Sequence, residues 1–131
     1  MNNRQKHSMF YLLYAMVLID NRVIKIEVDQ FFIAVEDFLT SMDFMDSLRA
    51  KSYISSWFVQ NYKDILREMK AVDREKFLMV HVKTLASSEH RLAIFKMMQK
   101  VAISDNDLHA SEAAFLEKVA KTWDLEATDI Q

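Results

Sequence analysis

Apolar residues recur along the chain at the three- and four-residue spacing of an α-helix. From Ser8 to Ile19 they are so dense that the expected helix lacks a polar face, which predicts a central helix buried on most of its surface. Elsewhere the apolar positions form a stripe on one face, and charged residues occupy the other. The pattern predicts helices at about residues 8–19, 25–39, 43–69, 73–86, 88–102 and 110–123, with one further turn in 126–130.

Polar residues mark the expected helix ends. Asp20 and Asn21 follow the first apolar run, and Asn adopts the left-handed conformation of helix C-termini more easily than most residues other than glycine. Either Ser41 or Asp43 can cap the third helix, and Asp73 can cap the fourth. We therefore expect the chain to leave its helices near these positions.

The composition restricts the fold to helices. The 131 residues include no glycine, proline or cysteine. Tight hairpin turns depend on glycine and proline, so the composition argues against a β-sheet protein. We predict an all-α, single-domain helical bundle of about six to seven helices that spans residues 1–131. The lack of cysteine also excludes disulfides, thiolate metal sites and a cysteine nucleophile.

The charge distribution bears on partners and location. The formal net charge is −2, with acidic and basic residues interspersed, so we expect no nucleic-acid partner. The basic N-terminal residues and the apolar run 9–19 look like the start of a signal peptide. However, no small-x-small cleavage site follows, and the run is too short to span a bilayer. We expect a cytoplasmic protein without direct membrane insertion.

Two short acidic segments, 20–27 and 105–112, repeat one pattern 85 residues apart. Four positions are identical at this offset, and most of the apolar positions around them are apolar in both copies. We interpret this as a duplicated helix-loop-helix unit, with repeats at about residues 8–40 and 92–125 and pseudo-twofold symmetry. The identical pairs are Asp20/Asp105, Asn21/Asn106, Glu27/Glu112 and Phe10/Phe95.

The acidic segments support two interpretations. Each places a Glu near the start of a helix, where free N–H groups and the helix dipole favour a negative charge, so the carboxylates can brace the corner. Alternatively, their oxygens can form a site for Ca²⁺ or Mg²⁺. The spacing excludes an EF-hand, which needs a glycine at position 6 and a Glu at position 12 of its loop. The candidate metal ligands are Asp20, Glu27, Asp105, Asp107 and Glu112.

The two segments resemble the signature of the TerB-like superfamily, the tellurite-resistance protein B group. In that family both halves of a duplicated helical domain read Ala-x-x-Asp-Gly-x-Ile/Val-x-x-x-Glu. The acidic positions of the signature fall on Asp20 and Glu27, and on Asp105 and Glu112. The glycine is replaced by asparagine in both copies.

The capping residue expected three positions before each Glu differs from the TerB-like pattern. It is Ile24 in the first segment and His109 in the second, so we expect no capping box in either. His109 could instead cap its helix alone or reach a cation, and a nitrogen ligand would suit Zn²⁺ better than Ca²⁺.

The resemblance implies a non-enzymatic binding or scaffolding module in a bacterial, tellurite-type stress response. It also implies an unidentified protein partner, and a homodimer is a further option. The alternative is a small metal-dependent hydrolase that uses the same carboxylates. Without a thiol, the chain is poorly suited to reduce or trap tellurium oxyanions.

Two other features of the sequence bear on packing and on partners. His81 lies on an apolar stripe, and we expect a neighbouring carbonyl or carboxylate to satisfy it. Met42, Phe44 and Met45 fall near a helix junction and are candidates for an exposed apolar patch used in dimerisation or partner binding.

Overall fold

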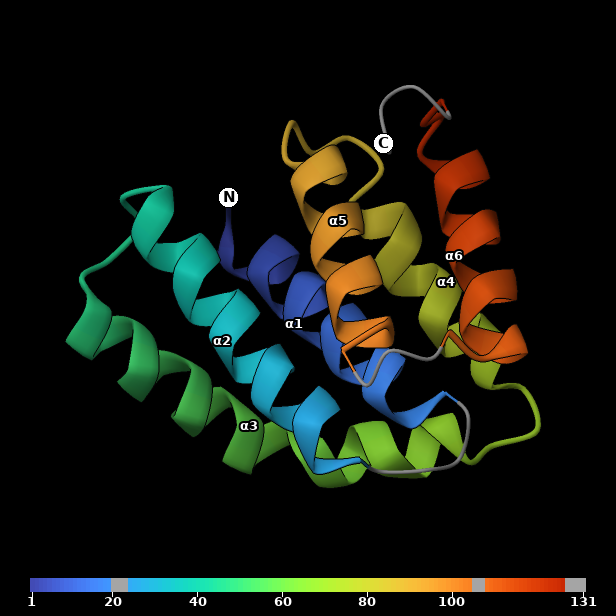
Figure 1. Cartoon of the computed structure of the whole chain (residues 1–131), viewed down its shortest axis with the longest axis horizontal. Coiled ribbons are helices and arrows are strands. Elements are labelled where there is room, and N and C mark those ends of the chain that lie inside the picture. The colour runs from blue at the N-terminus through green and yellow to red at the C-terminus, as the bar shows by residue number, and fades with distance from the viewer. Residues whose placement is uncertain (20–23, 105–107, 127–131) are drawn as a thin grey trace.

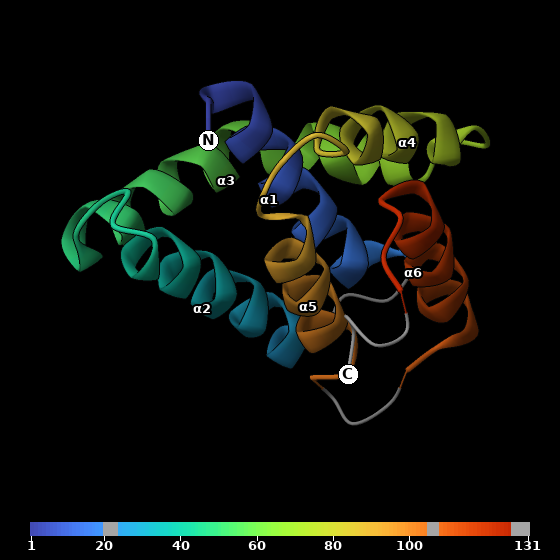
Figure 2. The same ribbon diagram turned by 90° about the horizontal axis from the view of Figure 1, so that it is seen from above.

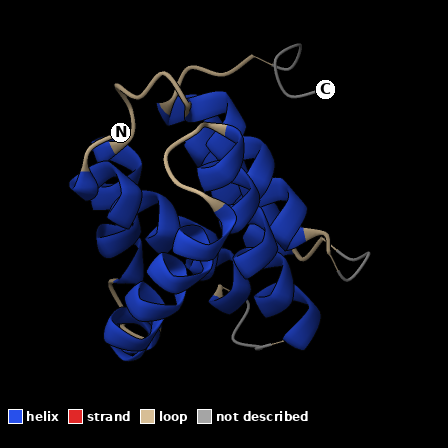
Figure 3. Ribbon diagram, turned by 90° about the vertical axis from the view of Figure 1, so that its left-hand side faces the viewer, coloured by secondary structure: helices blue, strands red, loops and turns tan. Residues whose placement is uncertain are grey.

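The computed structural model describes residues 1–19, 24–104 and 108–126. These residues form six helices and no strand, which confirms the predicted all-α class (Figures 1 and 3). The helices are α1 (Asn3–Leu18), α2 (Lys25–Ser41), α3 (Ser47–Met69), α4 (Arg74–Thr84), α5 (Arg91–Ala102) and α6 (Ala110–Thr122). Within the described ranges, no helix is both long and apolar enough to cross a membrane.

Helix α1 is the centre of the bundle, as its sequence predicts. Every residue from Ser8 to Ile19 is buried. It packs against α2, α3, α4 and α5, with α2 and α3 on one side and α4 and α6 on the other (Figures 1 and 2). Because α1 is surrounded by other helices, it has no side that faces solvent along this stretch and needs no polar face.

Helix α1 begins earlier than the apolar pattern predicts. The side chain of Asn2 accepts a hydrogen bond from the backbone N–H of Gln5 at 2.8 Å, and the Gln5 side chain accepts one from the N–H of Asn2 at 3.3 Å. This reciprocal capping box starts the helix at Asn3, upstream of the first buried residue.

At the junction between α2 and α3, the residue that caps α3 differs from the two predicted from the sequence. Asp43 does not cap α3 but has a φ of 57°, the left-handed conformation. The N–H groups of Asp43 and Phe44 bind the carbonyls of Thr40 and Leu39, which is the Schellman pattern that ends a helix. The α3 cap is Asp46, whose side chain accepts from the N–H of Arg49 at 2.8 Å, and Ser41 is the last residue of α2.

The same junction is more buried than predicted. Met42 is 41 % exposed, whereas Phe44 and Met45 are partly buried against the core. The ring of Phe44 lies beside those of Phe38 and His90, at centroid distances of 5.8 and 5.9 Å. The predicted patch is therefore reduced to Met42, because the Schellman turn folds Phe44 back onto the core.

Candidate functional site

The first acidic corner lies where α2 begins. Glu27 is the third residue of α2 and is fully buried, with 0 % of its surface exposed. Ile24 precedes the helix and offers no side-chain cap, but its carbonyl accepts from the N–H groups of Glu27 and Val28 at 3.0 and 3.1 Å. The carboxylate of Glu27 therefore lies in the first turn of α2, where the positive end of the dipole favours a negative charge.

The second acidic corner occupies the equivalent position at the start of α6. Glu112 is the third residue of α6 and is also 0 % exposed. The backbone N–H of His109 donates to Glu112 Oε1 at 3.2 Å, and the two residues form a capping box. The expectation that this corner lacks a capping box was wrong, because the imidazole of His109 can accept a hydrogen bond as a hydroxyl or carboxylate does.

The two corners match in register. Helices α2 and α6 begin at Lys25 and Ala110, 85 residues apart, as the offset between the acidic segments requires. The symmetry of the whole repeat units stays a prediction. The match at least places two buried carboxylates, Glu27 and Glu112, at equivalent positions in their helices.

The proposed cation ligands are only partly placed. Glu27 and Glu112 lie in separate corners, α1–α2 and α5–α6. Asp20, Asp105 and Asp107 lie outside the described residues. Among the residues that the structure does describe, no three His, Asp or Glu side chains come together so as to hold a metal ion. The buried carboxylates supply the hard oxygen donors that Ca²⁺ or Mg²⁺ prefers, so the donor chemistry fits, and the cation site stays a prediction.

A second polar cluster lies partly buried where α1, α3 and α4 meet. Ser8 Oγ and His81 Nδ1 are 2.9 Å apart. Trp57 Nε1–H donates to His7 Nδ1 at 3.0 Å. The Tyr11 hydroxyl donates to Glu68 Oε1, on α3, at 2.6 Å. His81 also stacks on Tyr11, with ring centroids 3.9 Å apart.

Burial sets the protonation of this cluster. Burial first, and then the nearby charges of His7 and Arg4, together lower the pKa of His81 to about 4. Burial also lowers the pKa of His7, although the carboxylate of Glu68 opposes this effect. The pKa of Tyr11 is raised, first by burial and then by its hydrogen bond to Glu68. Both imidazoles are therefore neutral at neutral pH.

Only one member of this cluster, His81, is recognisable from the sequence as a polar residue on an apolar stripe. His81 was expected to bind a carbonyl or carboxylate, but its partner is the hydroxyl of Ser8. The partners lie 50 to 73 residues apart in the chain, so no local spacing brings them together. The available signal was the presence of His7, Ser8 and Tyr11 at the edge of an otherwise apolar run.

The Ser8–His81 pair has the atoms of a nucleophile and a base but not the position. Ser8 is 2 % exposed and lies inside α1. A substrate cannot reach a hydroxyl buried in this way, so the pair is part of the packing of α4 on α1.

Comparison with known proteins finds a match to one protein family. The model of the family described as tellurite resistance protein TerB matches residues 6–131. Neither a curated protein nor a solved structure gives a significant match.

Proposed function

The chain belongs to the tellurite resistance protein TerB family, and from this premise we propose that it is a non-enzymatic binding module of a bacterial stress response. The observation that carries the proposal is the pair of fully buried carboxylates, Glu27 and Glu112, in equivalent first turns of α2 and α6. Buried carboxylates are costly unless they are hydrogen-bonded or bind a cation. We propose that each corner uses its Glu, together with Asp20 or Asp105 and Asp107, to bind Ca²⁺ or Mg²⁺.

A protein partner is the second part of the proposal. Ile26 and Ile33 lie in α2 and Met42 directly follows its last residue, and each of the three is 41 % to 50 % exposed. Large apolar side chains that remain accessible on one helix support contact with another protein, and a second copy of the chain is one option. We further propose that the module acts in the cytoplasm.

Thermal unfolding of the intact chain tests the cation. A ligand that binds only the native state stabilises it, and a cation at about 100 times its Kd adds about 2.7 kcal/mol. For a domain of this size we expect Tm in millimolar CaCl₂ or MgCl₂ to exceed Tm in EDTA by roughly 5–10 °C. The Asp105→Asn, Glu112→Gln double variant should reduce this rise.

A matched variant controls for the loss of two carboxylates. Asp64 and Glu117 have 60 % and 70 % exposed side chains, so Asp64→Asn, Glu117→Gln removes the same charge away from the corners. This control should keep the full rise. The Glu112 change lowers the baseline Tm because it alters the α6 capping box, so the difference between cation and EDTA is the quantity compared. Equal Tm in cation and EDTA for the unchanged chain would leave the carboxylates a bracing role only.

The alternative, a metal-dependent hydrolase on the same carboxylates, makes a different prediction. An enzyme of this kind would turn over a phosphoester or peptide substrate only with the cation present, and the Asp105→Asn, Glu112→Gln variant would be inactive. That result would support the hydrolase and contradict the non-enzymatic binding module.

A further inference from the structure

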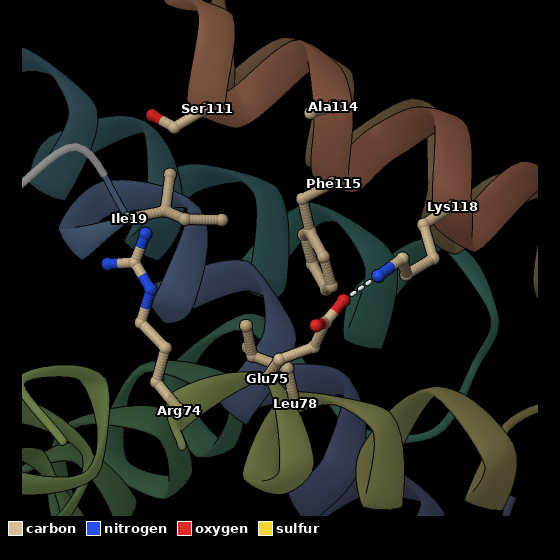
Figure 4. Close-up of a pocket in the computed structure, with 8 residues that line it drawn as sticks. All are labelled: Ile19, Arg74, Glu75, Leu78, Ser111, Ala114, Phe115 and Lys118. Atoms are coloured by element: carbon tan, nitrogen blue, oxygen red, sulfur yellow. Dashed lines mark ion pairs between the residues drawn. The ribbon is translucent and has the colours of Figure 1, made fainter. Parts of the chain in front are cut away.

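A cavity lies between α4 and α6, next to the end of α1, and among the described residues none of the carboxylates of the acidic corners lines it. Its volume is about 290 Å³, near the lower end of small-molecule sites. Figure 4 shows the side chains of both helices directed towards it, with Ile19 of the segment after α1 at one side. The lining residues are Ile19, Arg74, Glu75, Leu78, Ser111, Ala114, Phe115 and Lys118.

The base of the cavity is apolar. Ile19, Leu78 and Phe115 are 3 %, 2 % and 6 % exposed, so they are fixed in the core and present only a small apolar surface to the cavity. A short hydrocarbon placed against them would leave water, which is favourable by about 25 cal/mol for each Å² of apolar surface buried.

The two ends of the cavity differ in charge. At one end Glu75 and Lys118 form an ion pair, so their charges compensate each other (Figure 4). At the other end lie the guanidinium of Arg74 and the hydroxyl of Ser111. Within the described part of the chain, Arg74 forms no ion pair. Of the charges on the described residues that line the cavity, that of Arg74 is therefore the one not compensated by an ion pair.

The surroundings of Arg74 favour an anion. Ser111 is the second residue of α6, so its hydroxyl lies near the positive end of the helix dipole. A guanidinium binds a carboxylate through two parallel hydrogen bonds, and a hydroxyl can donate a third. One uncompensated charge matches a monovalent carboxylate better than a dianionic phosphate.

We propose that this cavity binds a small amphipathic carboxylate, of the class of medium-chain fatty acids. The carboxylate binds Arg74 and Ser111, and the hydrocarbon chain lies on Ile19, Leu78 and Phe115 towards the Glu75–Lys118 pair. The site uses none of the residues proposed for the cation, so each proposal can fail without the other.

Titration of the intact, ¹⁵N-labelled chain with sodium octanoate below its micelle concentration tests this site. Amide shifts in NMR spectra should saturate and concentrate at Ile19, Leu78, Ser111 and Phe115. Shifts scattered over the surface, or shifts that do not saturate, would overturn the proposal. Octylamine has the same tail and the opposite charge, and it should bind at least tenfold more weakly; equal binding would show that Arg74 does not select the ligand.

Variants separate the head from the tail. Arg74→Gln should weaken octanoate binding at least tenfold, whereas Arg67→Gln, on an exposed α3 side chain, should bind as the unchanged chain does. Ala114→Phe fills the cavity from an exposed position without removing a core group, so it should block binding while the fold is retained. Unchanged affinity in both Arg74→Gln and Ala114→Phe would place the ligand elsewhere. Inorganic phosphate that displaces octanoate at equal concentration would assign the site to phosphate instead.

Discussion

Single residues in this bundle carry polar chemistry that the apolar pattern hides. The Nδ1 atom of His7 accepts a hydrogen bond from Trp57, so a proton on that atom would face the indole N–H. The hydroxyl of Ser8 can donate to or accept from His81 Nδ1, so this pair tolerates either tautomer. The cluster is therefore satisfied when both imidazoles are neutral, and it holds α1 against α3 and α4.

Stability should consequently fall in mild acid. In the unfolded chain the pKa of His81 is 6.5, and in the fold it is about 4. As pH falls, His81 therefore takes up a proton in the unfolded state before it does so in the folded state. The contribution of neutral His81 to the free energy of unfolding is fully present above pH 6.5 and is lost as pH falls towards 4. After allowance for solvent screening, we expect the free energy of unfolding to drop by about 1–2 kcal/mol for this group. Urea denaturation at pH 7.5 and pH 4.5 measures the drop.

A variant isolates the contribution of His81 from carboxylates that titrate in the same range. His81→Gln keeps a hydrogen-bonding group for Ser8 but cannot take up a proton. Its loss of stability between the two pH values should be smaller than that of the unchanged chain. An equal loss would assign the acid sensitivity to other groups.

At the scale of elements, aspartate occupies the left-handed position at helix C-termini that glycine usually occupies. Asp43 and Asp124 have φ angles of 57° and 55°. Each is followed by an apolar residue, Phe44 or Leu125, whose N–H reaches back to the carbonyl of Leu39 or Ala120. Two Schellman motifs therefore end α2 and α6 in a chain without glycine, because the short polar side chain of Asp tolerates the left-handed region.

Substitution at Asp43 should follow this conformational requirement. Asp43→Val should lower the free energy of unfolding by about 1–2 kcal/mol, because a β-branched residue at positive φ is strained. Asp43→Gly should leave it unchanged or raise it, since glycine has no Cβ to clash. Chemical denaturation of both variants distinguishes them, and equal destabilisation by Val and Gly would indicate that the Asp carboxylate matters more than the backbone.

At the scale of the whole molecule, the fold depends on one helix that the others surround. Leu12, Leu13 and Met16 of α1 have no exposed surface. The C-terminal helix is fixed separately, since Trp123 Nε1–H donates to the buried carbonyl of Val82 at 2.7 Å and so joins α6 to α4. Substitution of a buried α1 residue should therefore destabilise the whole bundle, whereas substitution of an exposed residue on an outer helix should not.

A pair of leucine variants tests this. Leu12→Ala should lower the free energy of unfolding by about 2–5 kcal/mol, because it leaves a cavity among neighbours that cannot close it. Leu48→Ala makes the same chemical change on α3, where Leu48 is 80 % exposed, and should alter stability by no more than about 0.5 kcal/mol. A single cooperative transition is expected for both variants. Loss of one helix pair alone in Leu12→Ala would contradict a central role for α1.

The sequence by itself determined the helical class, the central position of α1 and the start of α2 and α6, because these follow from local composition and from the period of apolar residues. The repeated Asp–Asn–Glu pattern also located Glu27 and Glu112 in the first turns of their helices. Only the tertiary structure decided which polar residues meet. The Ser8–His81 and Trp57–His7 pairs, and the cavity between α4 and α6, join residues distant in the chain, and their contacts depend on how the helices pack. Helix periodicity fixes which face of a helix is buried, but not which side chain of another helix it will touch.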